Sequence, residues 1–109
     1  QEASFYAIGS GLDFQGGEVA GCGIPDTATA MHINFTAVNP GGFGYLRAWP
    51  YGFDEPSATL MAWYEGKSIS NATAMAINYS TFDFTVKVYL AGTDLVGDVV
   101  GYYVPVQLP

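Results

Sequence analysis

The sequence is short of charge, of cysteine, of histidine and of long apolar runs, and each shortage excludes a class of protein. Charged residues make up 12% of the 109 residues, and ten acidic side chains face only three basic ones, which gives a net charge of −7. A negative chain is repelled by the phosphates of nucleic acids and by anionic lipid surfaces. No apolar run approaches the ~20 residues that a membrane-spanning helix needs. We therefore expect neither nucleic-acid binding nor membrane insertion.

Cysteine occurs once, at Cys22, so the chain can form no internal disulfide. Its glycine neighbours make a small residue buried in a turn the simplest interpretation, ahead of a redox or intermolecular role. The single histidine, His32, falls on the outward side of a predicted strand. Any metal site would therefore depend on carboxylates and Cys22, and no acidic stretch has the spacing of a calcium loop. We expect no metal and no cofactor.

Catalytic motifs are also missing. No G-x-S-x-G nucleophile turn occurs in the sequence. Asp54 and Glu55 could form a carboxylate pair for glycoside hydrolysis, but they are adjacent in a turn where solvated charges are usual. Asp98 stands in an apolar segment, where we expect it to accept hydrogen bonds. We therefore expect no enzymatic activity and no catalytic residues.

What the sequence does contain is an internal repeat. Thr27–Thr36, TATAMHINFT, reappears as Asn71–Ser80, NATAMAINYS, with six of the ten positions identical. In the first copy large apolar side chains alternate with small or polar ones, and the second copy keeps this register. Such alternation is the pattern of a strand with one buried face. One β unit is expected to be used twice.

Each copy is followed by a second alternating segment, Gly44–Pro50 in the first half and Phe82–Leu90 in the second. The intervening Asn39-Pro40-Gly41-Gly42 is a strong turn signal, so we expect Gly44–Pro50 to fold back on the preceding strand as a β-hairpin. Aligning the two halves matches Arg47 with Lys87. The sequence thus predicts two similar hairpins related by a pseudo-twofold axis.

The whole pattern predicts an all-β fold. Short strands separated by Gly, Pro and Asn turns, with no helical periodicity, indicate an antiparallel β-sandwich that is Ig-like or jelly-roll-like. We expect one sandwich domain over residues 15–109, preceded by residues 1–14 as an edge strand or a mobile arm. The nearly continuous apolar Asp94–Val104 is expected in the middle of a sheet. The predicted core is Met31, Ile33, Phe35, Leu46, Met75, Ile77, Phe82, Phe84, Val86 and Val88.

A series of turn and core motifs runs from Gly21 to Tyr103. It comprises Gly23-Ile24-Pro25, Asn34-Phe35-Thr36, Asn39-Pro40, Gly44-Tyr45-Leu46, Trp49-Pro50 and Asp98-Val99-Val100-Gly101-Tyr102-Tyr103. Together these motifs resemble a β domain that is found singly and in tandem in large secreted or surface-attached bacterial proteins. That domain has no assigned catalytic residues, so the resemblance implies an extracellular, non-catalytic setting.

Two sets of surface residues are candidates for binding or modification. The register places Tyr45, Arg47 and Trp49 on one outer face, with Tyr51 just beyond. Flat aromatics beside a polar group suit stacking on a sugar ring or a protein interface, and burial beneath a loop is the third alternative. The acceptor pattern N-x-S/T, which is relevant only if the source cell glycosylates, occurs at Asn34, Asn71 and Asn78.

The functional hypothesis is a secreted structural subunit at the cell surface that associates with copies of itself into a fibre, filament or array. The chain starts at Gln1 without an apolar leader, as secreted proteins do after processing. Phe5, Tyr6 and Ile8 form an apolar N-terminal arm that could complete a neighbour's sheet, although it could equally pair within its own domain. The alternative function is a carbohydrate-binding or adhesion module.

Overall fold

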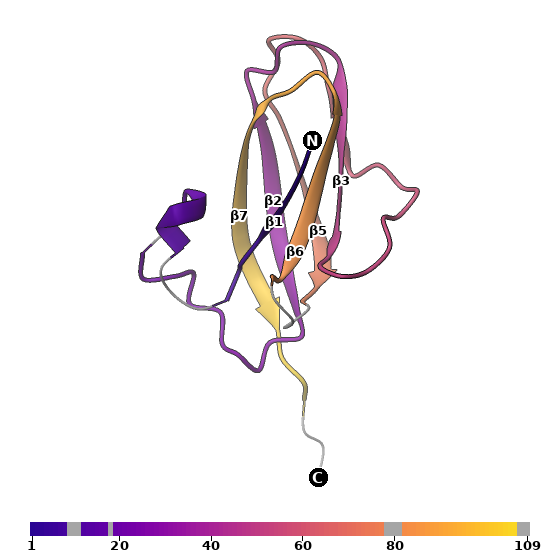
Figure 1. Cartoon of the computed structure of the whole chain (residues 1–109). Helices are drawn as coiled ribbons and strands as arrows, with labels where there is room; N and C mark the ends of the chain where they lie inside the picture. Colours follow the sequence, from indigo (N-terminus) through magenta and orange to yellow (C-terminus); the bar gives the residue numbers. More distant parts are fainter. Residues whose placement is uncertain (9–11, 18, 78–81, 107–109) are drawn as a thin grey trace.

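In a computed structural model, which describes residues 1–8, 12–17, 19–77 and 82–106, two antiparallel sheets pack face to face (Figure 1). The predicted all-β sandwich is confirmed. One short 3₁₀ turn, η1 (Leu12–Gln15), precedes the second strand. The strands are β1 (Glu2–Phe5), β2 (Ala30–Val38), β3 (Gly44–Pro50), β4 (Met61–Trp63), β5 (Ile69–Ala76), β6 (Phe84–Leu90) and β7 (Asp94–Tyr103).

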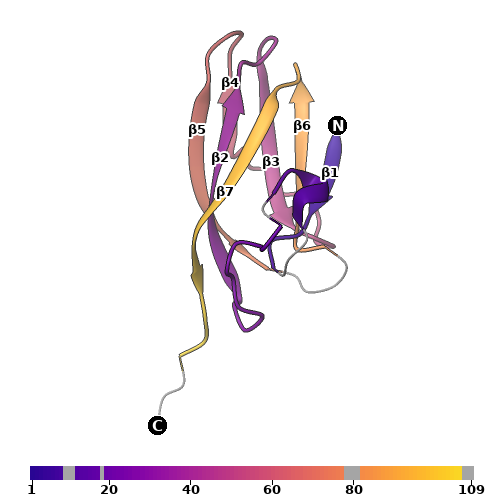
Figure 2. The same cartoon turned by 90° about the vertical axis from the view of Figure 1, so that its left-hand side faces the viewer.

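The four-stranded sheet has the order β1-β6-β3-β4, and the three-stranded sheet has the order β5-β2-β7. The two layers are seen edge-on in Figure 2. β2 and β3 therefore lie in different sheets, as do β5 and β6, and the predicted hairpins are wrong. The loop after β2 carries the chain across the core from one sheet to the other. Two consecutive strands show the same side-chain alternation whether they pair in one sheet or face each other from two sheets. The sequence pattern therefore could not distinguish a hairpin from a crossing of the core.

The two halves of the repeat are nevertheless related by a local twofold axis. Met31 pairs with its repeat equivalent Met75 where β2 meets β5. Arg47 pairs with its equivalent Lys87 where β3 meets β6. Equivalent residues can face each other in an antiparallel pair only when the axis passes between them. The repeat is a strand–loop–strand arch used twice, and the two arches build the centre of both sheets.

The core lies between the inner faces of the sheets. Eight of the ten predicted core residues are buried, whereas Phe82 and Val88 are half-buried. Phe82 packs instead against the rings of Tyr6 and Tyr51 at one end of the sandwich. The largest fully buried side chain is Trp63 of β4, which the predicted core did not include.

β7 lies at the edge of its sheet and pairs only with β2 among the described strands, so the expected central position for this segment is wrong. The pairing register with β2 shifts near Val100, which is the mark of a β-bulge. An apolar strand was read as central because central strands are buried on both faces. Here much of that apolar surface is exposed instead.

The N-terminal segment pairs within its own domain as the edge strand β1, next to β6. The Asp83 carboxylate accepts hydrogen bonds from the backbone N–H groups of Ala7 and Ile8, at 2.6 and 3.0 Å. Gln15 closes a two-way bond with the Tyr6 backbone, its Oε1 accepting from Tyr6 N at 2.9 Å and its Nε2 donating to Tyr6 O at 2.7 Å. Phe5 stacks on Phe84 with ring centroids 5.4 Å apart. Phe5 and Ile8 of the arm are therefore partly buried against the parent core.

Candidate functional site

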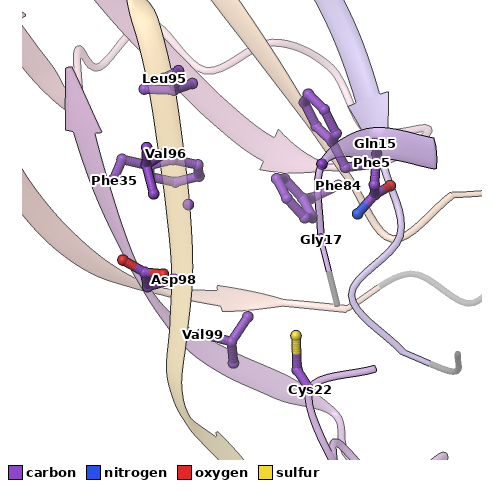
Figure 3. Close-up of a pocket in the computed structure, with 12 residues that line it drawn as sticks. Phe5, Gln15, Gly17, Cys22, Phe35, Phe84, Leu95, Val96, Asp98 and Val99 are labelled. Carbon is purple, nitrogen blue, oxygen red and sulfur yellow. The ribbon is translucent and has the colours of Figure 1, made fainter. Parts of the chain in front are cut away.

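One long side of the sandwich is open between β1 and β7. A groove of about 520 Å³ lies there, and its lining comes from both sheets and from the turn after η1 (Figure 3). Phe84 and Phe35 form its floor, with their ring centroids 6.2 Å apart in an edge-on arrangement. Val99 of β7 and Phe5 of β1 face it from opposite walls. The volume is in the range of sites that hold a small molecule or a short peptide segment.

The opposite side of the sandwich is closed where β4 lies. Next to β4 it opens into a smaller groove of about 290 Å³, which residues 48–50 of β3 and 73–76 of β5 line. β3 and β4 contact β5 across the core on this side. The Asn71 side-chain amide donates a hydrogen bond to the Leu60 carbonyl at 2.8 Å, which ties β5 to the segment before β4. Trp63 fills the space beneath, and its indole N–H donates to the Ala91 carbonyl at 3.3 Å.

Cys22 lies at one end of the open groove, and its sulfur points into it (Figure 3). The residue is exposed, so the expectation of a buried cysteine is wrong. The reason is local. Gly21 and Gly23 both have positive φ angles, 85° and 74°, a conformation that glycine adopts readily and that here holds the loop at the surface.

Apolar side chains are concentrated along β7 and the segment that follows it. Half of the exposed large apolar side chains of the described residues lie between residues 96 and 106. They are Val96, Val100, Tyr102, Tyr103, Val104 and Val106. Such a long apolar edge is unusual, because an unpaired edge strand offers free N–H and C=O groups to any other strand.

A second cluster lies on the outer face of the four-stranded sheet. Tyr45 of β3 and Tyr89 of β6 stack with centroids 4.8 Å apart and planes 11° apart. The Arg47 guanidinium lies 5.4 Å from the centre of the Tyr89 ring, and the Lys87 ammonium lies 4.8 Å from it. Glu55, from the loop before β4, joins them. Its carboxylate accepts from the Arg47 guanidinium at 2.8 Å and from the Tyr89 hydroxyl at 2.5 Å.

The charges in this cluster influence one another. The hydrogen bond from Tyr89 is the main cause that lowers the pKa of Glu55, and Arg47 and Lys87 add to it against the opposing effect of desolvation. Tyr89, and after it Glu55, raises the pKa of Lys87. The carboxylate and both cations are therefore partnered inside the chain, although Arg47 Nε is buried without a hydrogen-bond partner among the described residues.

The sequence predicted part of this cluster. Tyr45 and Arg47 are on the outer face, as expected, but Trp49 is only 7% exposed. Burial was one of the three alternatives for Trp49, and the structure has that one. Tyr51 is half-buried and contacts the ring of Phe82, away from the Tyr45–Tyr89 pair. Glu55 was assigned to a solvated turn, and only the folded loop brings it to Arg47.

The three glycosylation candidates lie in different settings. Asn34 is half-buried in β2, and its amide donates to the Thr36 hydroxyl at 3.4 Å. Asn71 is exposed, but its amide nitrogen is engaged with Leu60 as described above. Asn78 lies outside the described residues.

The remaining polar candidates do not come together. His32 is half-buried on β2, opposite Ala74 and Gly101. Asp98 is exposed on β7. No group of three or more His, Cys, Asp or Glu side chains suited to a metal ion occurs in the described parts of the chain. Nor does any helix in those parts have the length and apolar character to cross a membrane.

Comparison of the chain with protein-family models, with curated proteins and with solved structures found no match. Any function must therefore be argued from the groove, the β7 edge and the outer cluster themselves.

Proposed function

We propose that this chain is a non-catalytic structural module that works outside the cell and associates with copies of itself into a surface fibre or array. The observation that carries the proposal is β7. Its composition is that of a strand paired on both edges, yet it lies at a sheet edge with Val96 and Val100 exposed. An added strand would satisfy its free backbone groups and cover its apolar side chains.

Low charge supports association between identical chains. Few like charges have to approach one another when two copies associate. The resemblance to β domains of surface-attached bacterial proteins agrees with a structural role. An edge that accepts a strand from another copy, and a copy that gives one, make a head-to-tail contact. Such contacts extend into a filament unless the rotation between copies closes a ring.

The test places a charge on the β7 edge without touching the core. We expect the native chain to form particles larger than a monomer by light scattering and electron microscopy, and Val100→Lys to reduce them to monomers. Phe53→Lys is the matched control, because Phe53 and Val100 are 64% and 66% exposed and Phe53 lies in the loop between β3 and β4. A monomeric native chain, or equal particles from both variants, would overturn the proposal.

The alternative is carbohydrate binding or adhesion through the Tyr45–Tyr89 cluster. Half-exposed aromatic rings beside an arginine favour it. Against it, one ring face of each tyrosine is used by the other, and Arg47 is held by Glu55. A glycan array with the native chain and Tyr45→Ala decides this point. A defined sugar ligand that is lost in the variant would establish the alternative.

A further inference from the structure

The open groove has walls, a floor and a free strand edge, and the described chain does not fill it. Five consecutive residues of β7, from Leu95 to Val99, line one side. At 3.3 Å per residue they run for about 17 Å, which is the length of an ordinary short strand. The floor rings of Phe35 and Phe84 are almost fully buried, while Phe5 in the wall is half-buried. The site thus has the shape of a slot for one extended segment.

The N-terminal arm does not supply that segment. β1 is held in its own sheet by the Asp83 and Gln15 hydrogen bonds, and by a bond of 2.8 Å between the hydroxyls of Ser4 and Thr85. The N-terminal ammonium donates to the Val88 carbonyl at 2.9 Å. β1 forms a wall of the groove, so its removal would also dismantle the site that a partner has to enter.

A second β7 is also a poor occupant. Two β7 strands side by side would bring Asp94 and Asp98 of both copies onto one ribbon, and like charges on neighbouring strands are destabilising. β7 contains no basic residue, so nothing on the second β7 compensates these carboxylates. An occupant that is apolar and uncharged avoids this repulsion.

The segment after β7 has these properties. Val104–Val106 leaves the body of the sandwich beyond the end of β7 in both views, and Val106 is 80% exposed (Figures 1 and 2). The sequence from Val104 to Pro109 contains no charged residue. With period two, Val104 and Val106 fall on the same side. Pro105 lacks an N–H group, and its backbone faces the opposite edge from the backbones of Val104 and Val106. The missing donor therefore suits a strand that is paired along one edge only.

We infer that the segment Val104–Val106 of one copy lies in the groove between β1 and β7 of the next copy. Its backbone pairs along the free edge of β7, and its valines cover Phe5, Phe84 and Val99. The inference rests on the proposed function, because it names the contact through which copies associate. Each copy accepts one segment in this groove and gives one segment, so the contact is head-to-tail.

Cys22 provides a test, because its sulfur points into the groove and the chain has no other cysteine. In Val106→Cys, mild oxidation should join Cys22 of one copy to the new cysteine of another and release two thiol hydrogens to the oxidant. We expect a ladder of covalent oligomers on a non-reducing gel, with a peptide that links positions 22 and 106. Phe53→Cys is the control, since Phe53 is 64% exposed in a different part of the surface. It should give no more oligomer than the native chain.

Particle size under reducing conditions separates the two ideas. If the native chain assembles but Val106→Cys yields no 22–106 link between copies, the inference is wrong and the proposed function stands. A link closed within a single chain also overturns the inference. If the native chain is a monomer at every concentration tested, both fail. A chain that stops at Tyr103 should be monomeric, and the peptide Tyr102–Pro109 should bind to it; unchanged particles from that shorter chain would contradict the inference independently.

Discussion

Between β4 and β5 the sandwich is closed by large side chains and by an exposed hydrogen bond from Asn71 to Leu60, whereas between β1 and β7 it is closed by neither. At the β4 side, Trp63 is completely buried, and the groove beside β4 is smaller than the one at the open side, about 290 Å³ against about 520 Å³. At the open side, phenylalanine rings form the floor of a groove. The difference shows that burial of the core does not require both sides of a sandwich to be finished by the chain itself. An unfinished side is a place where a partner can contribute.

The largest effect should come from breaking the closed side. Trp63→Ala removes the largest fully buried side chain and leaves a cavity, so we expect a loss of about 3–5 kcal/mol in the free energy of unfolding. Urea denaturation followed by circular dichroism measures this loss. Phe5→Ala on the open side, where the ring is half-buried, should cost distinctly less. Equal losses would mean that the two sides do not differ energetically.

A smaller effect should come from loosening the open side at its anchor. Asp83→Ala leaves the N–H groups of Ala7 and Ile8 without their acceptor, and an unsatisfied buried donor costs about 1–3 kcal/mol. Hydrogen exchange should become faster at these amides and in β1, but not in β4. Asp54→Ala, in an exposed turn, is the control and should leave both rates unchanged. Faster exchange on the β4 side would contradict a local anchor.

The smallest effect should come from Glu55, which lies on the outer face of the four-stranded sheet, away from both the open side and the closed side. The Tyr89 hydrogen bond and the nearby cations lower the pKa of Glu55 in the folded protein. A lowered folded pKa stabilises the protein above the unfolded value of about 4.3. This contribution disappears as the pH falls through the folded pKa. Glu55→Gln should therefore remove a small, salt-sensitive part of the acid destabilisation, measured as melting temperature against pH. Glu65→Gln, in an exposed turn, should leave the profile unchanged.

The sandwich could be predicted because alternation of apolar and polar residues is a local property. Met31, Ile33 and Phe35 had to share one buried face wherever their strand was placed. The layer of each strand could not be predicted in this way, because the loop after β2 is compatible with a hairpin and with a crossing of the core. The apolar composition of β7 indicated a paired strand, but the number of partners is a property of the whole sheet.

The candidate site residues also divide into those that strand register could place and those that depend on the packing of the whole fold. Tyr45 and Arg47 could be placed outside from strand register alone, and the structure has them there. Glu55 could not, since its position depends on how the loop before β4 folds. The groove combines Phe5, Phe84 and Val99, which are far apart in the sequence and meet only when the two sheets pack. No local sequence pattern predicts that these three side chains line one groove.

The local twofold axis brings together positions that are far apart in the sequence. Met31 pairs with Met75, its equivalent in the repeat, so a substitution at either position changes the surroundings of the other. Around this contact the two copies have kept six of ten residues, whereas Arg47 and Lys87 at the second contact keep only their charge. A repeated arch that pairs with its copy has the geometry of a twofold-symmetric dimer within one chain. The strands β1, β4 and β7 lie outside the repeat, so the difference between the open side and the closed side comes from them.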